Sequence, residues 1–77
     1  GILAYPNPSQ GVFKMELPVS VKSYSYKIMD ALGNTVKTGM MTYDKNEVDC
    51  SEFANGVYFI SISQNSTTVN RKITIQK

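Results

Sequence analysis

The side chains that could do chemistry in this chain are few. Cys50 is the only cysteine, and there is no histidine, the commonest general base and metal ligand in proteins. A nucleophilic cysteine needs a neighbouring base and an electropositive site, whereas the apolar pattern around Cys50 is typical of a buried strand. We therefore expect Cys50 to be an inert buried thiol. We also expect the chain not to be an enzyme and to bind no cofactor.

One acidic stretch is a candidate for metal binding. It runs from Asp44 to Glu47 and continues at Asp49. It lacks the central glycine and the bidentate glutamate that a calcium loop of the EF-hand type requires. We interpret it as a solvated turn that holds no metal.

Charge and hydropathy exclude two classes of partner. The net charge is +2, and the basic residues are spread along the chain, which is too weak and scattered for nucleic-acid binding. The apolar runs are too short for direct membrane insertion. A single cysteine cannot form an internal disulfide, so the cysteine content does not indicate whether the protein works in an oxidising or a reducing compartment. Because the chain starts at Gly1 without a starting Met, we expect it to be a piece of a longer polypeptide.

The elements that position these side chains are predicted to be strands. Glycine, proline and Asn/Asp clusters divide the chain into pieces about 8–12 residues apart, and no window has helical periodicity. We predict one domain over residues 1–77, an all-β, immunoglobulin-like antiparallel β-sandwich of about seven strands with modest stability. The expected strands are residues 2–5, 12–17, 24–29, 35–42, 48–53, 57–63 and 67–76. Residues 1–4 are either part of the first strand or a linker remnant.

The segment Tyr5-Pro6-Asn7-Pro8-Ser9-Gln10-Gly11 is built to shape the backbone. Its prolines cannot donate to a ladder, and Asn7-Pro8 fits the start of a type I turn. We expect the Asn7 side chain to accept from the Ser9 amide and Gly11 to take a positive φ. The sequence therefore predicts a rigid corner between the first two strands.

Other turns and strands have comparable signals. Asp30 is expected to bond forward to backbone amides, with Gly33 in the left-handed conformation. Asn55-Gly56 is the tightest turn signal, and the hydroxyl of Tyr58 is expected to reach a backbone partner. A bulge is expected at Gly39. Tyr24 and Tyr26 are expected to pack inward and not to form a sugar-stacking platform.

Four segments agree in order and spacing with one known pattern. They are residues 5–11 as Y-P-N-P-x-x-G, residues 28–33 ending in D-x-x-G, residues 48–60 ending in G-V-Y-F-I, and residues 72–75, a basic residue before branched apolar ones. In these segments the chain resembles the type A C-terminal sorting domains of the type IX (Por) secretion system of Bacteroidetes bacteria. Cys50 departs from the leucine that the family favours. The resemblance marks these residues as motif or recognition residues: Tyr5, Pro6, Asn7, Pro8, Gly11, Asp30, Gly33, Gly56, Tyr58, Lys72, Ile73, Ile75 and Lys77.

The resemblance implies a signal that directs a cargo protein across the outer membrane. Such a domain follows its cargo into the periplasm, where the outer-membrane translocon and shuttle proteins recognise it. For many substrates a cell-surface sortase then removes the domain and attaches the cargo to anionic lipopolysaccharide. The cargo would end at the cell surface or outside the cell.

The last strand leaves two interpretations open. Arg71, Lys72 and Lys77 could guard an edge strand against aggregation. Alternatively, an exposed edge could be what the translocon engages by strand addition. An exposed edge also makes edge-to-edge dimers possible.

A different class of function competes with export. The chain could be an immunoglobulin-like or fibronectin-like binding or spacer module of a surface or secreted protein. That alternative predicts exposed aromatic side chains in a row, and a polypeptide that continues past Lys77.

Overall fold

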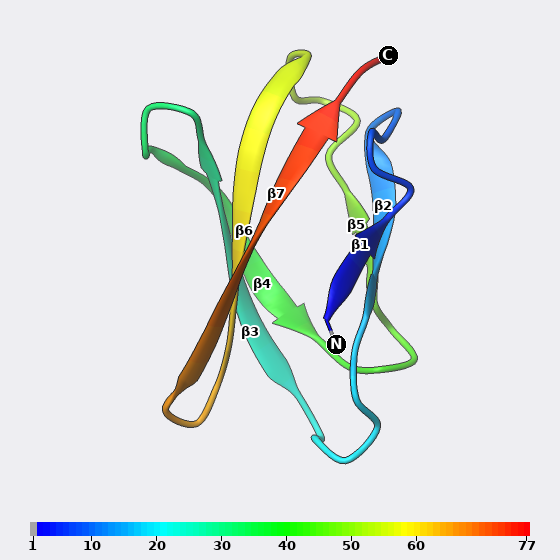
Figure 1. The fold of residues 1–77 in the computed structure, drawn as a ribbon, viewed down its shortest axis with the longest axis vertical. Helices are drawn as coiled ribbons and strands as arrows, with labels where there is room; N and C mark the ends of the chain where they lie inside the picture. Colours follow the sequence, from blue (N-terminus) through cyan, green and yellow to red (C-terminus); the bar gives the residue numbers. More distant parts are fainter. Residues whose placement is uncertain (1) are drawn as a thin grey trace.

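The computed structural model describes residues 2–77 and contains, within them, seven strands and no helix (Figure 1). Gly1, which the sequence assigned to the first strand or to a linker remnant, lies outside the described residues. The strands are β1 Leu3–Tyr5, β2 Val12–Glu16, β3 Tyr24–Asp30, β4 Thr35–Met41, β5 Glu47–Asp49, β6 Gly56–Gln64 and β7 Thr67–Ile75.

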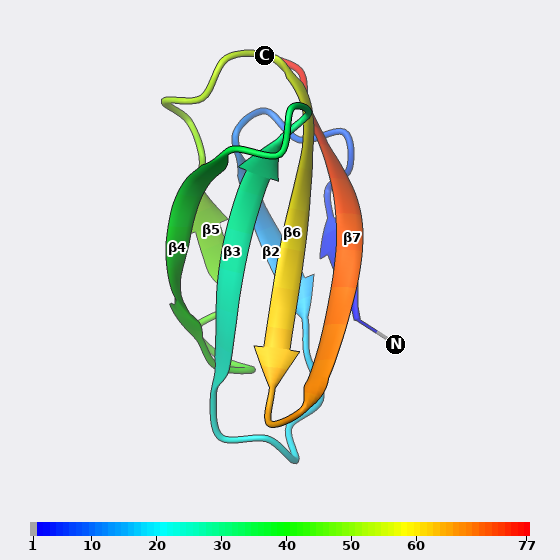
Figure 2. The same cartoon turned by 90° about the vertical axis from the view of Figure 1, so that its left-hand side faces the viewer.

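The strands form two antiparallel sheets. The small sheet has the order β1-β2-β5, and the large sheet has the order β4-β3-β6-β7. The sheets lie face to face, with the small sheet behind the large one in Figure 2. The hairpins β3–β4 and β6–β7 stay within the large sheet, while the other connections after β2 cross between sheets. The predicted all-β sandwich is confirmed.

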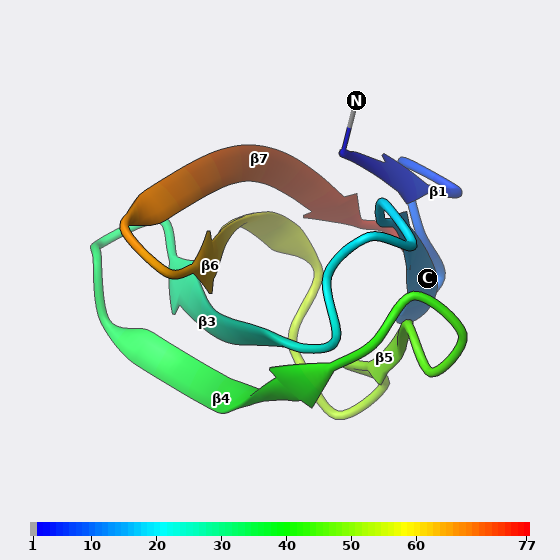
Figure 3. The same ribbon diagram turned by 90° about the horizontal axis from the view of Figure 1, so that it is seen from below.

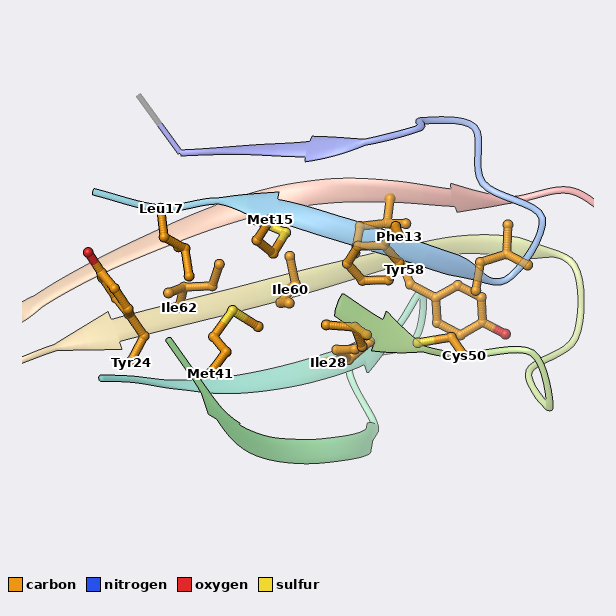
Figure 4. Packing of buried hydrophobic residues seen from close by; sticks show 13 residues of the cluster. Phe13, Met15, Leu17, Tyr24, Ile28, Met41, Cys50, Tyr58, Ile60 and Ile62 are labelled. Carbon is orange, nitrogen blue, oxygen red and sulfur yellow. The ribbon is translucent and has the colours of Figure 1, made fainter. Parts of the chain in front are cut away.

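The core lies between the sheets and follows the alternation of the sequence. Phe13, Met15 and Leu17 are all buried, as are the inward residues of the other strands. Figure 4 shows these side chains meeting between the two sheets. Alternation buries one face of each strand because successive side chains point to opposite sides. The buried hydrophobic residues are Phe13, Met15, Leu17, Tyr24, Ile28, Met41, Val48, Cys50, Tyr58, Ile60, Ile62, Ile73 and Ile75.

The tyrosines of β3 pack inward, as predicted. Tyr24 is buried, and its hydroxyl donates to the Pro18 carbonyl at 3.0 Å. Tyr26 is half-buried and lies over Gly39, where a Cβ would come within 2.7 Å of the Tyr26 hydroxyl oxygen. Gly39 therefore makes room for a ring. The bulge expected there is wrong, since the register shifts between Ile28 and Met29.

The turn at Asn55-Gly56 also differs from its prediction. β5 and β6 belong to different sheets, so residues 50–55 form a crossing connection and not a tight hairpin. Two contacts of Tyr58 hold this connection in place. The Tyr58 hydroxyl donates to the Ala54 carbonyl at 2.7 Å, and the centroid of the Tyr58 ring lies 5.2 Å from that of Phe53. The expected backbone partner of Tyr58 is thus confirmed, although the turn type is not.

Candidate functional site

Three segments that are distant in sequence meet at one end of the sandwich. They are residues 5–11, residues 50–56 and residues 72–77, which we call the junction. Figure 1 shows them together at the end that carries the C-terminus. The Cys50 amide donates to the Gly11 carbonyl at 2.6 Å, which joins the first segment to the second. The Lys77 amide donates to Asn55 Oδ1 at 3.0 Å, which joins the second to the third.

Asn7 links the corner to β7. Its side-chain amide donates to the Lys72 carbonyl at 2.9 Å, and its Oδ1 accepts from the Thr74 amide at 3.0 Å. One side chain thus supplies the donor and the acceptor that a neighbouring strand would offer. The predicted bond from the Ser9 amide to Asn7 is wrong, because that amide donates to the Thr74 carbonyl at 2.8 Å. The peptide bonds Tyr5–Pro6 and Asn7–Pro8 are both cis.

Ser9 is a junction residue that the sequence analysis missed. It is the buried polar side chain of the described residues, at 1% exposure. Its hydroxyl donates to the Val12 carbonyl at 3.0 Å and accepts from the Gly11 amide at 2.9 Å. Its carbonyl accepts from the Gln76 amide at 2.7 Å, so Ser9 forms a parallel bridge to Ile75. The signal available in the sequence was a small hydroxyl residue between a proline and a glycine.

Gly11 is required by its conformation and by its surroundings. Its φ is +120°, and a Cβ there would lie 2.9 Å from the Cα of Ser51. A non-glycine residue would be strained and would also push against backbone. The predicted positive φ is confirmed. Because Gly11 has no Cβ, the backbone of residues 50–51 can approach the corner closely.

Cys50 is a junction residue whose thiol is buried, at 1% exposure. Burial raises the pKa of Cys50 to about 11, despite the opposing effect of nearby Lys37. The thiol is therefore protonated at neutral pH and is a poor nucleophile. The predicted burial is confirmed.

Lys77 is held by the connection between β5 and β6. Its Nζ donates to the Ser51 carbonyl at 2.5 Å and also to the Phe53 carbonyl. In the sequence, Lys77 is one of three basic residues that could guard the last strand. Its ammonium group is instead occupied by backbone carbonyls of the junction.

The outer edge of β7 is largely covered. The Lys72 carbonyl, both backbone groups of Thr74 and the Gln76 amide are all taken by Asn7 and Ser9. Arg71 adds a further link, since its Nε donates to the Ile2 carbonyl at 2.7 Å and its Nη1 to the Asn70 carbonyl at 2.8 Å. Figure 3 shows the N-terminal strand next to the end of β7. The exposed edge of the second interpretation is therefore not found at residues 72–76, and within residues 2–77 the free edge of β7 is confined to its first half.

The Asp30 turn lies at the same end, as Figure 2 shows for the β3–β4 connection. The amides of Asn34 and Leu32 each donate to Asp30 Oδ1 at 2.9 Å. These bonds, with that of Asn34 the strongest, hold the pKa of Asp30 below its usual value. Gly33 has a φ of +90°. Both predictions for this turn are confirmed.

The motif residues divide into an internal and an external set. Gly11, Tyr58, Ile73 and Ile75 are buried, and Asp30 is half-buried. All the others are exposed, and Pro6 and Pro8 line a shallow hollow of about 470 Å³ with Gln10 and Val12. The exposed motif residues are Tyr5, Pro6, Asn7, Pro8, Gly33, Gly56, Lys72 and Lys77. The external set is therefore accessible to solvent in the folded domain.

Three further observations concern metal binding, membrane-spanning helices and exposed aromatic side chains. Among residues 2–77, no group of three or more Cys, Asp or Glu side chains is placed to hold a metal ion. No helix suited to crossing a membrane is found in the same range. The exposed aromatic residues Tyr5, Tyr43 and Phe59 lie on separate elements, so they do not form the row that a glycan-binding module predicts.

Two comparisons with known proteins complete the description. A family model for the secretion system C-terminal sorting domain matches residues 3–76. A search of curated proteins found no match. The matched range includes the corner, the crossing connection and nearly all of the last segment, so the family pattern covers the junction.

Proposed function

The chain belongs to the family of secretion system C-terminal sorting domains, and from that premise we propose that the folded junction is the part of the signal that the export machinery recognises. Membership makes the chain a C-terminal sorting signal for type IX secretion, which directs export out of the cell through the type IX machinery. The proposal concerns which structural feature of the domain carries this signal.

The observation that supports the proposal is the joining of distant motif segments. Asn7 and Lys72 are 65 residues apart in sequence, yet the side chain of one bonds the backbone of the other. Because the motif residues come together only in the folded domain, the signal is a conformation as well as a string of residues. A partner that recognises the junction would distinguish folded cargo tails from unfolded ones.

The external set of the junction offers the contact surface. Pro6 and Pro8 are exposed beside a hollow, and Tyr5 is 46% exposed next to them. Residues with little conformational freedom lose little entropy on binding, so a proline-lined surface suits recognition. The partners in this proposal are the outer-membrane translocon and the shuttle proteins.

The proposal extends to the steps around translocation. The cargo passes through the periplasm, and a cell-surface sortase then cuts upstream of β1 and attaches the cargo to anionic lipopolysaccharide, or the cargo is released. The domain itself catalyses no step. The protonated, buried state of Cys50 and the lack of histidine support this part.

A secretion assay tests the proposal. Residues 1–77 are fused to the C-terminus of a stable periplasmic reporter in a host with a type IX system, and reporter is measured at the surface and in the medium. We expect export, and we expect an Asn7→Ala fusion to be exported poorly. Asn70→Ala is the matched control, because among the described residues the Asn70 side chain makes no hydrogen bond. A folded wild-type fusion that stays in the periplasm would contradict the proposal.

Charge reversals separate recognition from folding. Lys72 is exposed and its ammonium group has no bond among residues 2–77, whereas the ammonium group of Lys77 bonds two carbonyls. Lys72→Glu should therefore reduce export at an unchanged Tm, and Lys77→Glu should lower both. If Lys72→Glu left export intact, this residue would not belong to the contact surface.

A further inference from the structure

The two edges of the large sheet are β7 and β4, and they differ in how they are covered. The N-terminal segment covers the second half of β7 through Asn7 and Ser9. Within residues 2–77, no hydrogen bond joins the backbone of β4 to any segment other than β3. β4 runs over seven residues, Thr35–Met41, and contains no proline. It is therefore the longer uncovered edge.

The register identifies which backbone groups of β4 face outward. In antiparallel sheets, alternate residues direct both their N–H and C=O groups to the same side. Thr74 directs both of its backbone groups away from β6. When the pairing is followed from β7 through β6 to β3, the β3 residue opposite Gly39 directs its backbone groups toward β4. Gly39 is therefore bonded to β3. The outward groups of β4 are thus those of Thr38 and Met40. Such a row of unpaired groups is a template for another strand.

The side chains on the outer face of β4 are apolar or small, and they are exposed. Val36 is 40% exposed and Met40 is 66% exposed, with the exposed Thr38 between them on the outer face of the sheet. Lys37 is the single charged residue of β4, and it points inward and is half-buried. The outer face of β4 therefore carries no charge, and the inward-pointing Lys37 is the one charged residue of this strand that could guard the edge.

A charged hollow lies beside this edge. Its volume is about 210 Å³, and it is lined by Lys37, Asp49, Ser51, Glu52 and Phe53. Asp49 and Glu52 supply two carboxylates to the hollow, whereas the Lys77 ammonium group nearby is already bonded to the Ser51 and Phe53 carbonyls, so the hollow offers acceptors to a basic side chain. A strand added to β4 would direct every second side chain toward this space, because opposite residues share a face.

We propose that the outer edge of β4 is a docking site for an extended segment of a partner protein, which adds to the large sheet as a further strand. The segment has apolar side chains at alternate positions, next to Val36 and Met40, and a basic side chain that enters the hollow at Asp49 and Glu52. Binding of this kind takes its affinity from backbone hydrogen bonds and its selectivity from the alternate side chains. The capacity of β4 to take a strand does not depend on the export function.

A peptide titration with matched proline variants tests the docking site. The probe is a synthetic peptide of alternating valine and threonine with one central arginine, added to the purified domain while backbone amide signals are followed by NMR. Thr38→Pro removes an outward N–H group and spares the ladder to β3, and Thr68→Pro removes an outward group from the free half of β7. We expect Thr38→Pro to weaken binding by about tenfold or more, and Thr68→Pro to change it by less than about twofold.

Wild-type signals keep the test decisive if the Thr38→Pro variant fails to fold. The peptide should shift the amide signals of Thr38 and Met40 more than those of Thr68 and Asn70, and replacing its arginine by glutamate should weaken binding. Larger shifts on β7, or no binding at millimolar peptide, would overturn the proposal. Shifts at Thr38 and Met40 that grow with protein concentration alone would mean that a second copy occupies the edge, which would also overturn it.

Discussion

The two flanks of the sandwich close in different ways. On the β1/β7 flank, Asn7, Ser9 and Arg71 supply bonds that tie the N-terminal segment to the last strand. On the β4/β5 flank, no backbone hydrogen bond joins the two edge strands within the described residues. Unpaired backbone groups at a sheet edge favour pairing with a further strand. The β1/β7 flank is therefore protected against such pairing, and the β4/β5 flank is open to it.

The difference explains where the family motif lies. Segments 5–11 and 72–77 act as one unit on the closed flank, and residues 50–56 bind both of them. No motif residue lies in β4. The motif residues of these three segments therefore lie where the first and last parts of the domain are joined, and the opposite edge of the sandwich carries none of them.

The largest effect is expected at Gly11, where the corner meets the crossing connection. Gly11→Ala should destabilise the domain by about 2–4 kcal/mol, because it combines backbone strain with a clash at Ser51. Gly33→Ala is the control, since its φ is also positive but no atom lies within 4 Å of the added Cβ. It should cost only about 1 kcal/mol. Equal losses in urea unfolding would show that the close approach at Gly11 is not important.

A smaller effect is expected at Asn7. Asn7→Ala should lower the free energy of unfolding by about 1–2 kcal/mol, because it leaves the Lys72 carbonyl and the Thr74 amide without their partner. Asn70→Ala on the uncovered half of β7 should change it by less than about 0.5 kcal/mol. Thermal and urea unfolding of both variants provide the comparison, and similar losses would remove the distinction between the two halves of the strand.

The pH dependence of stability should reveal the buried thiol of Cys50 in the junction. The pKa of Cys50 rises from 9.0 to about 11 on folding, so the folded state disfavours the thiolate. This contribution to stability is complete below pH 9 and is lost as the pH rises toward 11. Relative to Cys50→Val, the native domain should therefore lose stability over that interval, and its thiol should react slowly with a disulfide reagent at pH 8. Rapid reaction in the folded state would contradict the buried position.

The smallest effect is expected at Asp30, which is near the surface. Hydrogen bonds from Asn34 and Leu32 lower the pKa of Asp30 from 3.8, so its contribution to stability is present above that value. It is lost as the pH falls through the lower folded pKa. The stability difference between the native domain and Asp30→Asn should therefore shrink below about pH 3.8 and be constant near neutral pH. A constant difference down to pH 2 would mean that the carboxylate is not stabilised by this turn.

Local patterns in the sequence were sufficient for the sandwich and for several of its turns. The alternation of apolar and polar residues in the sequence marks the inward faces of β2, β6 and β7, and the Asp30 turn was predictable because its donors lie within four residues. The junction was not predictable, because Asn7 bonds residues 65 and 67 positions away. From the sequence, an asparagine after a proline could equally well bond within its own turn. The position of β7 in the fold decides between that local bond and the bonds to the last strand.

Lys77 and Gly39 illustrate the same limit. A terminal lysine is usually solvated, and the carbonyls that hold Lys77 depend on the path of a connection between two sheets. A glycine in a strand suggests a bulge, and the ring of Tyr26 that needs its space comes from the paired strand. Partners across the fold, and not residue types, determine both roles.

Amide hydrogen exchange tests the difference between the flanks most directly. The amides of Thr74 and Gln76 are bonded to Asn7 and Ser9, while those of Thr38 and Met40 face outward on β4. We predict that exchange at Thr74 and Gln76 is slower on the order of a hundredfold or more than at Thr38 and Met40, and that Asn7→Ala accelerates it at Thr74. Equally fast exchange at all four amides of the wild-type domain would contradict a closed β1/β7 flank.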